Sequence, residues 1–250
     1  MAWTASDHRS VYHVGTCGWH YPHWRGPFYP PELAPEEWLR FYARHFSTVE
    51  VNNSFYRLPD LQTVHAWTAD APPAFCFAIK ASRYITHMKK LADPGRSLER
   101  FVRVVDAFGA RRGPVLFQLP PHWHRDPRRL ALFLRALPRR LRCAFELRDP
   151  SWHDPEIYDL LHRHRAAFCI WELAGFRAPI QLTTDYAYVR LHGPGAAYGG
   201  CYSRCRLTEW AERIRSWSGI SDVYVYFDND ESAYAVRNAL ELKAILDADR

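Results

Sequence analysis

The feature that most constrains this chain is the regular alternation of short β-rich runs with helical patterns along its 250 residues. Eight runs combine β-branched and aromatic residues and are bounded by turn residues, which predicts strands. They are Tyr12–Cys17, Thr48–Asn52, Phe75–Lys80, Val115–Leu119, Cys143–Arg148, Ala167–Trp171, Tyr186–His192 and Val223–Asp228. Eight strands alternating with helices over about 250 residues predict an α/β fold, a single (β/α)8 TIM-type barrel. No linker or internal repeat suggests a second domain, so one domain is expected over residues 1–250.

Helix start signals lie in the intervals between these strands. Proline suits the first turn of a helix, and Ser, Thr or Asp before a segment with helical apolar spacing is typical of an N-cap. The signals are Pro35, Ser97, Asp126-Pro127, Asp154-Pro155 and Thr208, and a last helix is expected around residues 235–245.

The composition restricts the class of protein. Hydrophobic residues make up 48% and charged residues 24% of the chain, which is ordinary for a globular protein and excludes disorder. No apolar run approaches the roughly 18 residues of a membrane span, and residues 1–10 lack an apolar signal-peptide core, so no membrane association and a cytoplasmic location are expected. The net charge of +6 mildly favours anionic partners. The six cysteines do not form a disulfide pattern, and most lie in apolar runs where a thiol acts as a small hydrophobe.

The phase of the strands places polar side chains on the face opposite the apolar one. Phe145 and Leu147, for example, leave Glu146 and Arg148 on the other face. In six of the strands, the polar residues that alternate with the apolar ones are expected to point into the barrel. They are Glu50, Asn52, Lys80, Gln118, Glu146, Arg148, Arg190, His192 and Asp228. Most of these stand at the C-terminal ends of strands, where barrel enzymes place their chemistry. The alternative is a plug of salt bridges, because buried ionisable groups are costly unless they pair.

Aromatic and polar residues follow several strands and are expected at the same end. The residues added to the predicted substrate-binding set on this ground are Trp19, Tyr21, Tyr56, His87 and Trp152. Asn229, next to Asp228, is also included in this set. Aromatic faces beside polar groups suit a sugar ring or a nucleobase, although such residues can also simply cap a barrel. The glycine-rich phosphate loops and the nucleophile and zinc motifs of common enzyme classes are missing, so no cofactor is expected.

The ordered motifs of the chain resemble those of the YecE-like family, a domain of unknown function numbered 72. The motifs are the segments 15–19, 48–56, 77–81 with 86–87, 116–121, 145–152, 188–193 and 224–230. The resemblance spans nearly the whole chain and implies a TIM-type barrel, without implying a reaction. Two positions depart from the family pattern: Cys17 stands where serine is common, and Asp228 stands where asparagine is common.

Three functions fit these observations. The first is an enzyme, a hydrolase or isomerase, acting on a phosphorylated or sugar-like anion: Lys80, Arg148 and Arg190 would hold the anion, Glu50 or Glu146 would act as general base, and His192 as acid. The second is a metal-dependent hydrolase of the barrel endonuclease type, with a divalent metal on Glu50, Glu146, His192 and Asp228. The third is a nucleic-acid-binding module in which Arg25, Arg57 and Arg83 meet phosphates. Glu50 and Glu146 could also form a glycosidase pair, and the sequence does not give the oligomeric state.

Overall fold

The computed structural model describes residues 10–248 and divides them into two compact units. Unit 1 comprises residues up to Val49, Ile170–Ile180 and the segment from Asp185 onward, and unit 2 comprises Glu50–Cys169 and Gln181–Thr184. The boundary between Val49 and Glu50 and the boundary between Cys169 and Ile170 both fall inside strands. The single domain expected over 1–250 stays a prediction, and the N-terminal segment without a signal-peptide pattern lies outside the described residues, apart from Ser10.

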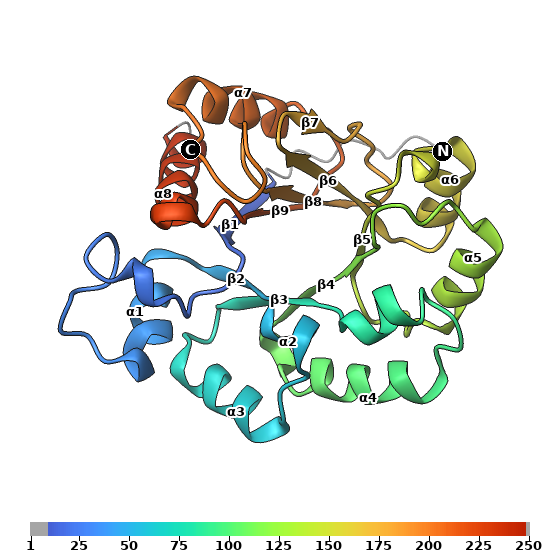
Figure 1. The fold of residues 1–250 in the computed structure, drawn as a ribbon, viewed down its shortest axis with the longest axis horizontal. Helices are drawn as coiled ribbons and strands as arrows, with labels where there is room; N and C mark the ends of the chain where they lie inside the picture. Colours follow the sequence, from blue (N-terminus) through green and yellow to red (C-terminus); the bar gives the residue numbers. More distant parts are fainter. Residues whose placement is uncertain (1–9, 249–250) are drawn as a thin grey trace. The chain divides into compact units, whose positions relative to one another are not determined.

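Unit 1 is built on parallel strands in the order β1-β9-β8-β6. These are β1 (Val11–Thr16), β9 (Asp222–Phe227), β8 (Tyr186–Leu191) and the second half of β6 (Ala167–Leu173). Helix α8 (Tyr234–Asp247) packs against β1 and β9, and α7 (Arg204–Arg215) packs against α8 (Figure 1). Helix α1 (Trp38–His45) precedes the first half of β2 (Thr48–Val51).

Unit 2 continues the same pattern with strands in the order β6-β5-β4-β3-β2. Its strands include β3 (Cys76–Lys80), β4 (Arg112–Gln118) and β5 (Cys143–Glu146), and the pairs β3–β4, β4–β5 and β5–β6 are parallel. Its helices are α2 (Asn53–Tyr56), α3 (Leu61–Asp70), α4 (Gly95–Asp106), α5 (Pro127–Ala136) and α6 (Pro155–Arg163). The strand order and the alternation with helices are those of an α/β TIM-type barrel, which confirms the predicted fold class.

The helix start signals are correct where aspartate precedes proline. Asp126 accepts a hydrogen bond from the backbone N–H of Arg129, and Asp154 accepts one from that of Glu156, as N-caps do. Two other signals are wrong. Ser97 lies inside α4, where its hydroxyl donates to the carbonyl of Pro94, and Thr208 lies inside α7, which Ser203 caps.

The structure also contains elements that the sequence patterns did not predict. Helix α3 buries only Val64 and therefore lacks the apolar stripe that reveals most helices, although its N-cap Asp60 accepts from the N–H of Thr63. A two-residue strand, β7 (Phe176–Arg177), pairs antiparallel with β6. The described residues also form five short 3-10 helical turns. A π-helical turn, η3 (Tyr84–Met88), contributes to the site.

The core consists of the strands and of the apolar helix faces that cover them. Strands β2, β5 and β8 are buried along their whole length, as expected for parallel strands that pack on both faces. The six cysteines form no disulfide within the described residues, in agreement with the sequence analysis. Over residues 10–248, every helix is too short or too polar to cross a bilayer.

Candidate functional site

Polar residues predicted from strand phase gather at the ends of three neighbouring strands of unit 2. Lys80 is the last residue of β3, Gln118 the last of β4 and Glu146 the last of β5. The β4–β5 register pairs Gln118 with Glu146, which places their side chains next to each other at the carboxyl edge of the sheet. We call Lys80, Arg83, His87, Gln118, Glu146 and Arg148 the cationic cluster.

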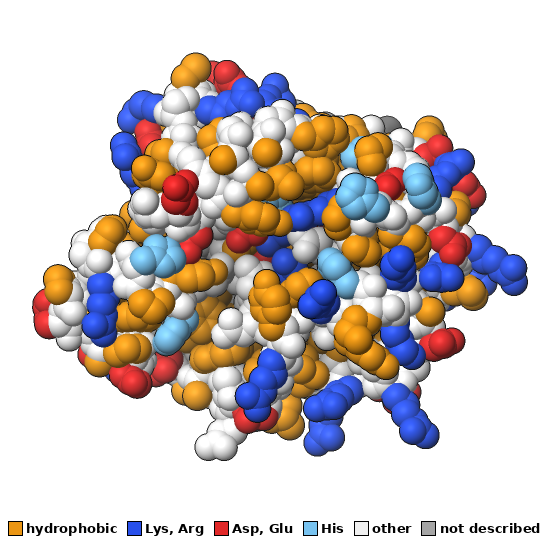
Figure 2. All heavy atoms as spheres, viewed as in Figure 1, with side chains coloured by type: hydrophobic (Ala, Val, Ile, Leu, Met, Phe, Trp, Pro, Cys, Tyr) orange, Lys and Arg blue, Asp and Glu red, His pale blue; other side chains and the backbone are white. Residues whose placement is uncertain are grey.

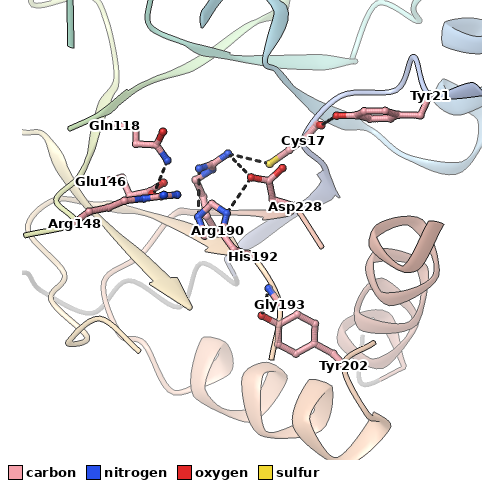
Figure 3. A network of polar contacts seen from close by, with 10 residues as sticks. All are labelled: Cys17, Tyr21, Gln118, Glu146, Arg148, Arg190, His192, Gly193, Tyr202 and Asp228. Carbon is pink, nitrogen blue, oxygen red and sulfur yellow. Dashed lines mark hydrogen bonds and ion pairs between the residues drawn. The ribbon is translucent and has the colours of Figure 1, made fainter. Parts of the chain in front are cut away.

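Glu146 is the buried centre of hydrogen bonds in this cluster (Figure 3). Its Oε1 accepts from Nε2 of Gln118 at 2.8 Å and from Nε of Arg148 at 2.6 Å. The Glu146 side chain is fully buried, whereas that of Arg148 is slightly exposed. A charge-assisted bond of this length fixes the position of the guanidinium, so Arg148 is held in a defined orientation before any ligand arrives.

Lys80 is held by two residues of helix α2, Phe55 and Ser54. Its Nζ lies 4.5 Å from the centroid of the Phe55 ring, a cation–π geometry, and the side chain is almost completely buried. The hydroxyl of Ser54 donates to the Lys80 carbonyl at 2.6 Å, which attaches α2 to the end of β3. The segment after β2 therefore supplies one wall of the cluster.

His87 reports the electrostatic character of the cluster. It lies on the turn η3, its ring stands edge-on to Phe55 at 5.1 Å, and its Nδ1 is 2.9 Å from the hydroxyl of Thr86. Burial, and to a smaller extent the positive charges of Lys80, Arg83 and Arg148, lower the pKa of His87 to about 4 against an opposing contribution from Glu146. The imidazole is therefore neutral at pH 7, in surroundings where cations outnumber carboxylates.

A second group of predicted residues meets in unit 1 around the guanidinium of Arg190 (Figure 3). Arg190 lies near the end of β8, while Cys17, His192 and Asp228 directly follow β1, β8 and β9. The Nη2 atom of Arg190 is 3.3 Å from the Sγ of Cys17 and 3.3 Å from Oδ2 of Asp228. We call these four residues the Arg190 cluster.

Both ring nitrogens of His192 have partners in the Arg190 cluster. Nδ1 lies 2.9 Å from Oδ2 of Asp228, and Nε2 lies 3.3 Å from Nη1 of Arg190. A carboxylate only accepts and a guanidinium only donates, so the partners assign the proton to Nδ1 and the lone pair to Nε2. His192 is fully buried, whereas the Asp228 side chain is 18% exposed. The arrangement positions Asp228, and the acid role predicted for His192 stays a prediction.

A buried amide network anchors the segment that follows His192. The backbone N–H of Gly193 donates to the hydroxyl of Tyr202, and the N–H of Tyr202 donates to Oδ1 of Asn238. Nδ2 of Asn229 donates to the same Asn238 oxygen and to the carbonyl of Gly200. Asn238 was missed by the sequence analysis, although an asparagine among the apolar residues of the last helix is the signal that could have revealed it.

The other predicted site residues are dispersed. Glu50 is fully buried in β2, and Oδ1 of Asn52 is buried without a hydrogen-bond partner among residues 10–248. Trp152 is fully buried, and its Nε1 donates to the carbonyl of Trp123. Trp19 is buried, and the Tyr21 hydroxyl donates to the carbonyl of Cys17.

Trp152 and Tyr21 therefore form hydrogen bonds within the chain, as capping aromatics would, and the predicted binding roles of these two residues and Trp19 stay predictions. Tyr56, by contrast, is 81% exposed. Arg83, which the sequence analysis placed only in a nucleic-acid interface, is one of the cations that lower the pKa of His87 in the cationic cluster.

In each cluster a carboxylate is paired with a guanidinium group. Glu146 is paired with Arg148, and Asp228 is paired with Arg190 at 3.3 Å. Across residues 10–248, no three His, Cys, Asp or Glu side chains are grouped as metal ligands would be.

The fold and these clusters define an α/β barrel protein with charged residues at the carboxyl ends of its strands. The chain belongs to the family described as "Protein of unknown function DUF72", whose model matches residues 13–250.

The UPF0759 protein YunF of Bacillus subtilis is 26% identical over 275 residues, covering 95% of both chains. The UPF0759 protein YecE of Escherichia coli is 29% identical over 132 residues, covering 49% of this chain and 48% of its own. The crystal structure of a DUF72 family protein from Thermotoga maritima is 29% identical and covers 95% of this chain and 99% of its own, with a TM-score of 0.83. These similarities confirm the YecE-like resemblance and the TIM-type barrel.

Proposed function

We propose that this protein is an enzyme that acts on a small anionic substrate, and that the anion binds to the cationic cluster. The observation that carries the proposal is the set of three cations, Lys80, Arg83 and Arg148, around the half-buried neutral imidazole of His87. Two of these cations are held in place, Arg148 by Glu146 and Lys80 by the Phe55 ring. Positively charged donors fixed before binding favour a phosphate, sulfate or carboxylate group, because little side-chain entropy is lost on binding.

The same features favour an anion over the metal-dependent alternative. A divalent cation would have to bind near three positive charges, and Oε1 of Glu146 already accepts from Gln118 and Arg148. An incoming anion instead relieves the repulsion among the cations. The neutral His87 can donate or accept a hydrogen bond at pH 7 without adding charge.

The chemical step is assigned to carboxylates that the structure holds at strand ends. Glu146 is the preferred general acid or base of unit 2, since it is buried and oriented by two donors. In unit 1 the candidate is Asp228, which His192 and Arg190 orient. Proton transfer by a carboxylate fits either a hydrolase or an isomerase, and Glu50 remains a candidate on the basis of its complete burial.

Isothermal titration calorimetry with inorganic phosphate and a hexose phosphate tests the anion site. Saturable binding is expected, and Lys80→Met should weaken it about tenfold, the effect of losing one hydrogen bond to a charged group. Lys243→Met removes a lysine from α8 and is the matched control, which should bind as the parent does. Absence of binding, or equal loss in both variants, would refute the anion site.

Turnover tests the second part of the proposal. A substrate found among sugar phosphates should be converted by the parent and not by Glu146→Gln, while circular dichroism shows that the variant is folded. Full activity of Glu146→Gln would remove Glu146 from the chemical step and leave Glu50 as the candidate of unit 2.

A further inference from the structure

A second candidate binding surface in unit 2 is a wide groove bordered by α2, α3, η3 and α4. Its volume is about 1780 Å³, and the residues that line it include Tyr56 and Arg57 from the end of α2, Tyr84 from η3, and Arg96 and Arg100 from α4. None of the residues of the cationic cluster lines it. The groove therefore requires an explanation of its own.

The groove has an excess of positive charge. Its lining contains five cations, Arg57, Lys89, Arg96, Arg100 and Arg103, and two acids, Asp60 and Asp93. Asp60 is already engaged as the N-cap of α3, where it accepts from the backbone N–H of Thr63 at 2.8 Å.

None of these five cations forms an ion pair with another residue between 10 and 248, whereas Arg112 and Arg140 of the same unit both pair with Asp106. Five cations against two acids leave the groove with a net positive charge, which attracts a polyanion.

Exposed aromatic rings accompany these charges. Tyr56 is 81% exposed and Tyr84 is 47% exposed, and both line the groove. The Nζ of Lys89 lies 5.8 Å from the centroid of the Tyr84 ring. On this face of the molecule, Lys and Arg side chains alternate with hydrophobic ones over α2 and α4 (Figure 2). Large exposed rings are costly in water and can stack on the faces of unpaired bases.

We propose that this groove binds single-stranded nucleic acid. The five cations would contact consecutive phosphates, and Tyr56 and Tyr84 would stack on bases. An acidic peptide would use the cations and leave the rings unexplained, while a duplex would keep its bases inaccessible to the rings. This inference is independent of the proposed enzymatic function, because its residues are not those of the cationic cluster.

Fluorescence anisotropy with a labelled 20-nucleotide oligo-dT tests the proposal, with a labelled poly-glutamate peptide as the competing ligand. With about 0.7 counterions released per phosphate of a single strand, five contacts predict about a 100-fold loss of affinity between 50 and 200 mM salt. The double variant Arg96→Glu/Arg100→Glu should weaken oligo-dT binding about tenfold or more. Arg128→Glu/Arg135→Glu makes the same change in charge on the exposed face of α5 and should have at most a small effect.

The stacking component separates a nucleic acid from an acidic peptide. Tyr56→Ala removes a highly exposed ring and should weaken oligo-dT binding at least fivefold without affecting the fold. Lys243→Met, on α8, should leave this binding unchanged. The proposal is overturned if oligo-dT does not bind at 50 mM salt, if the α5 control weakens binding as much as the α4 variant, or if Tyr56→Ala has no effect while poly-glutamate binds more tightly.

Discussion

Replacing His87 with glutamine should change how the stability of the protein depends on pH. In the folded protein the pKa of His87 is lowered to about 4, chiefly by burial and then by the charges of Lys80, Arg83 and Arg148. In the unfolded chain it returns to the ordinary value of 6.5. Between these two values the unfolded chain binds a proton that the folded protein does not, so acid favours unfolding.

The size of the effect follows from the two pKa values. Each unit of pKa corresponds to about 1.4 kcal/mol, so the difference between the unfolded and folded pKa values of His87 corresponds to about 3 kcal/mol of unfolding free energy. Most of this free energy is lost when the pH has fallen to about 4.5. The stabilising neutral state is fully kept above pH 6.5 and is lost as the pH falls toward 4. His87→Gln removes this titration and keeps a polar side chain beside Thr86.

Urea denaturation followed by tryptophan fluorescence at pH 7.5 and pH 4.5 measures the effect. The parent should lose about 2–3 kcal/mol more between the two pH values than His87→Gln does. His65→Gln, which replaces an exposed histidine of α3, is the control and should follow the parent. If the parent and His87→Gln lose the same free energy, the pKa of His87 is not lowered by its surroundings in the folded protein.

Three further substitutions test other parts of the structure by the same denaturation assay. Gly193 has a φ of +125°, and a Cβ there would overlap backbone carbonyl oxygens, so Gly193→Ala should lower the unfolding free energy by about 2 kcal/mol or more. Arg190→Met should cost about 3 kcal/mol because it leaves Asp228 without its guanidinium, and adding Asp228→Asn should restore part of the loss. Burial raises the pKa of Asp230 to about 6, so stability falls as the pH rises from about 4 to 6, and Asp230→Asn should remove that dependence.

Each of these expectations has a clear contrary result. A Gly193→Ala protein as stable as the parent would mean that the turn adjusts without strain. Additive effects of the Arg190 and Asp228 substitutions would mean that the pair is not coupled. An unchanged pH dependence in Asp230→Asn would mean that other groups titrate in that window.

The sequence predicted the strands and the polar strand-end residues well because both follow from local patterns. A period of two with apolar residues on one face identifies Lys80, Gln118 and Glu146, and the chain order of the strands places them at one edge. The partners of these residues were not predictable, since they depend on side-chain rotamers. Glu146, for example, pairs with Arg148, which lies two residues further along the chain.

The parts that escaped prediction depend on irregular backbone and on distant residues. The π-helical turn that places His87 beside Phe55 has no sequence pattern of its own. Asn238 accepts hydrogen bonds from the Asn229 side chain and from the backbone N–H of Tyr202. Tyr202 is far from Asn238 in the chain, so the sequence does not reveal this contact. Fold class follows from periodicity, whereas electrostatic function follows from contacts that only the folded chain makes.

The most direct test of the anion site is the ionisation of His87 followed by NMR, with and without phosphate. Without phosphate the imidazole should titrate with a pKa of about 4. A phosphate bound among Lys80, Arg83 and Arg148 would offset their charges, so phosphate should raise this pKa, and Lys80→Met should need about ten times more phosphate for its change to saturate. A His87 pKa near 6.5 in the free protein, or one that phosphate leaves unchanged, would contradict the assignment of an anion site to the cationic cluster.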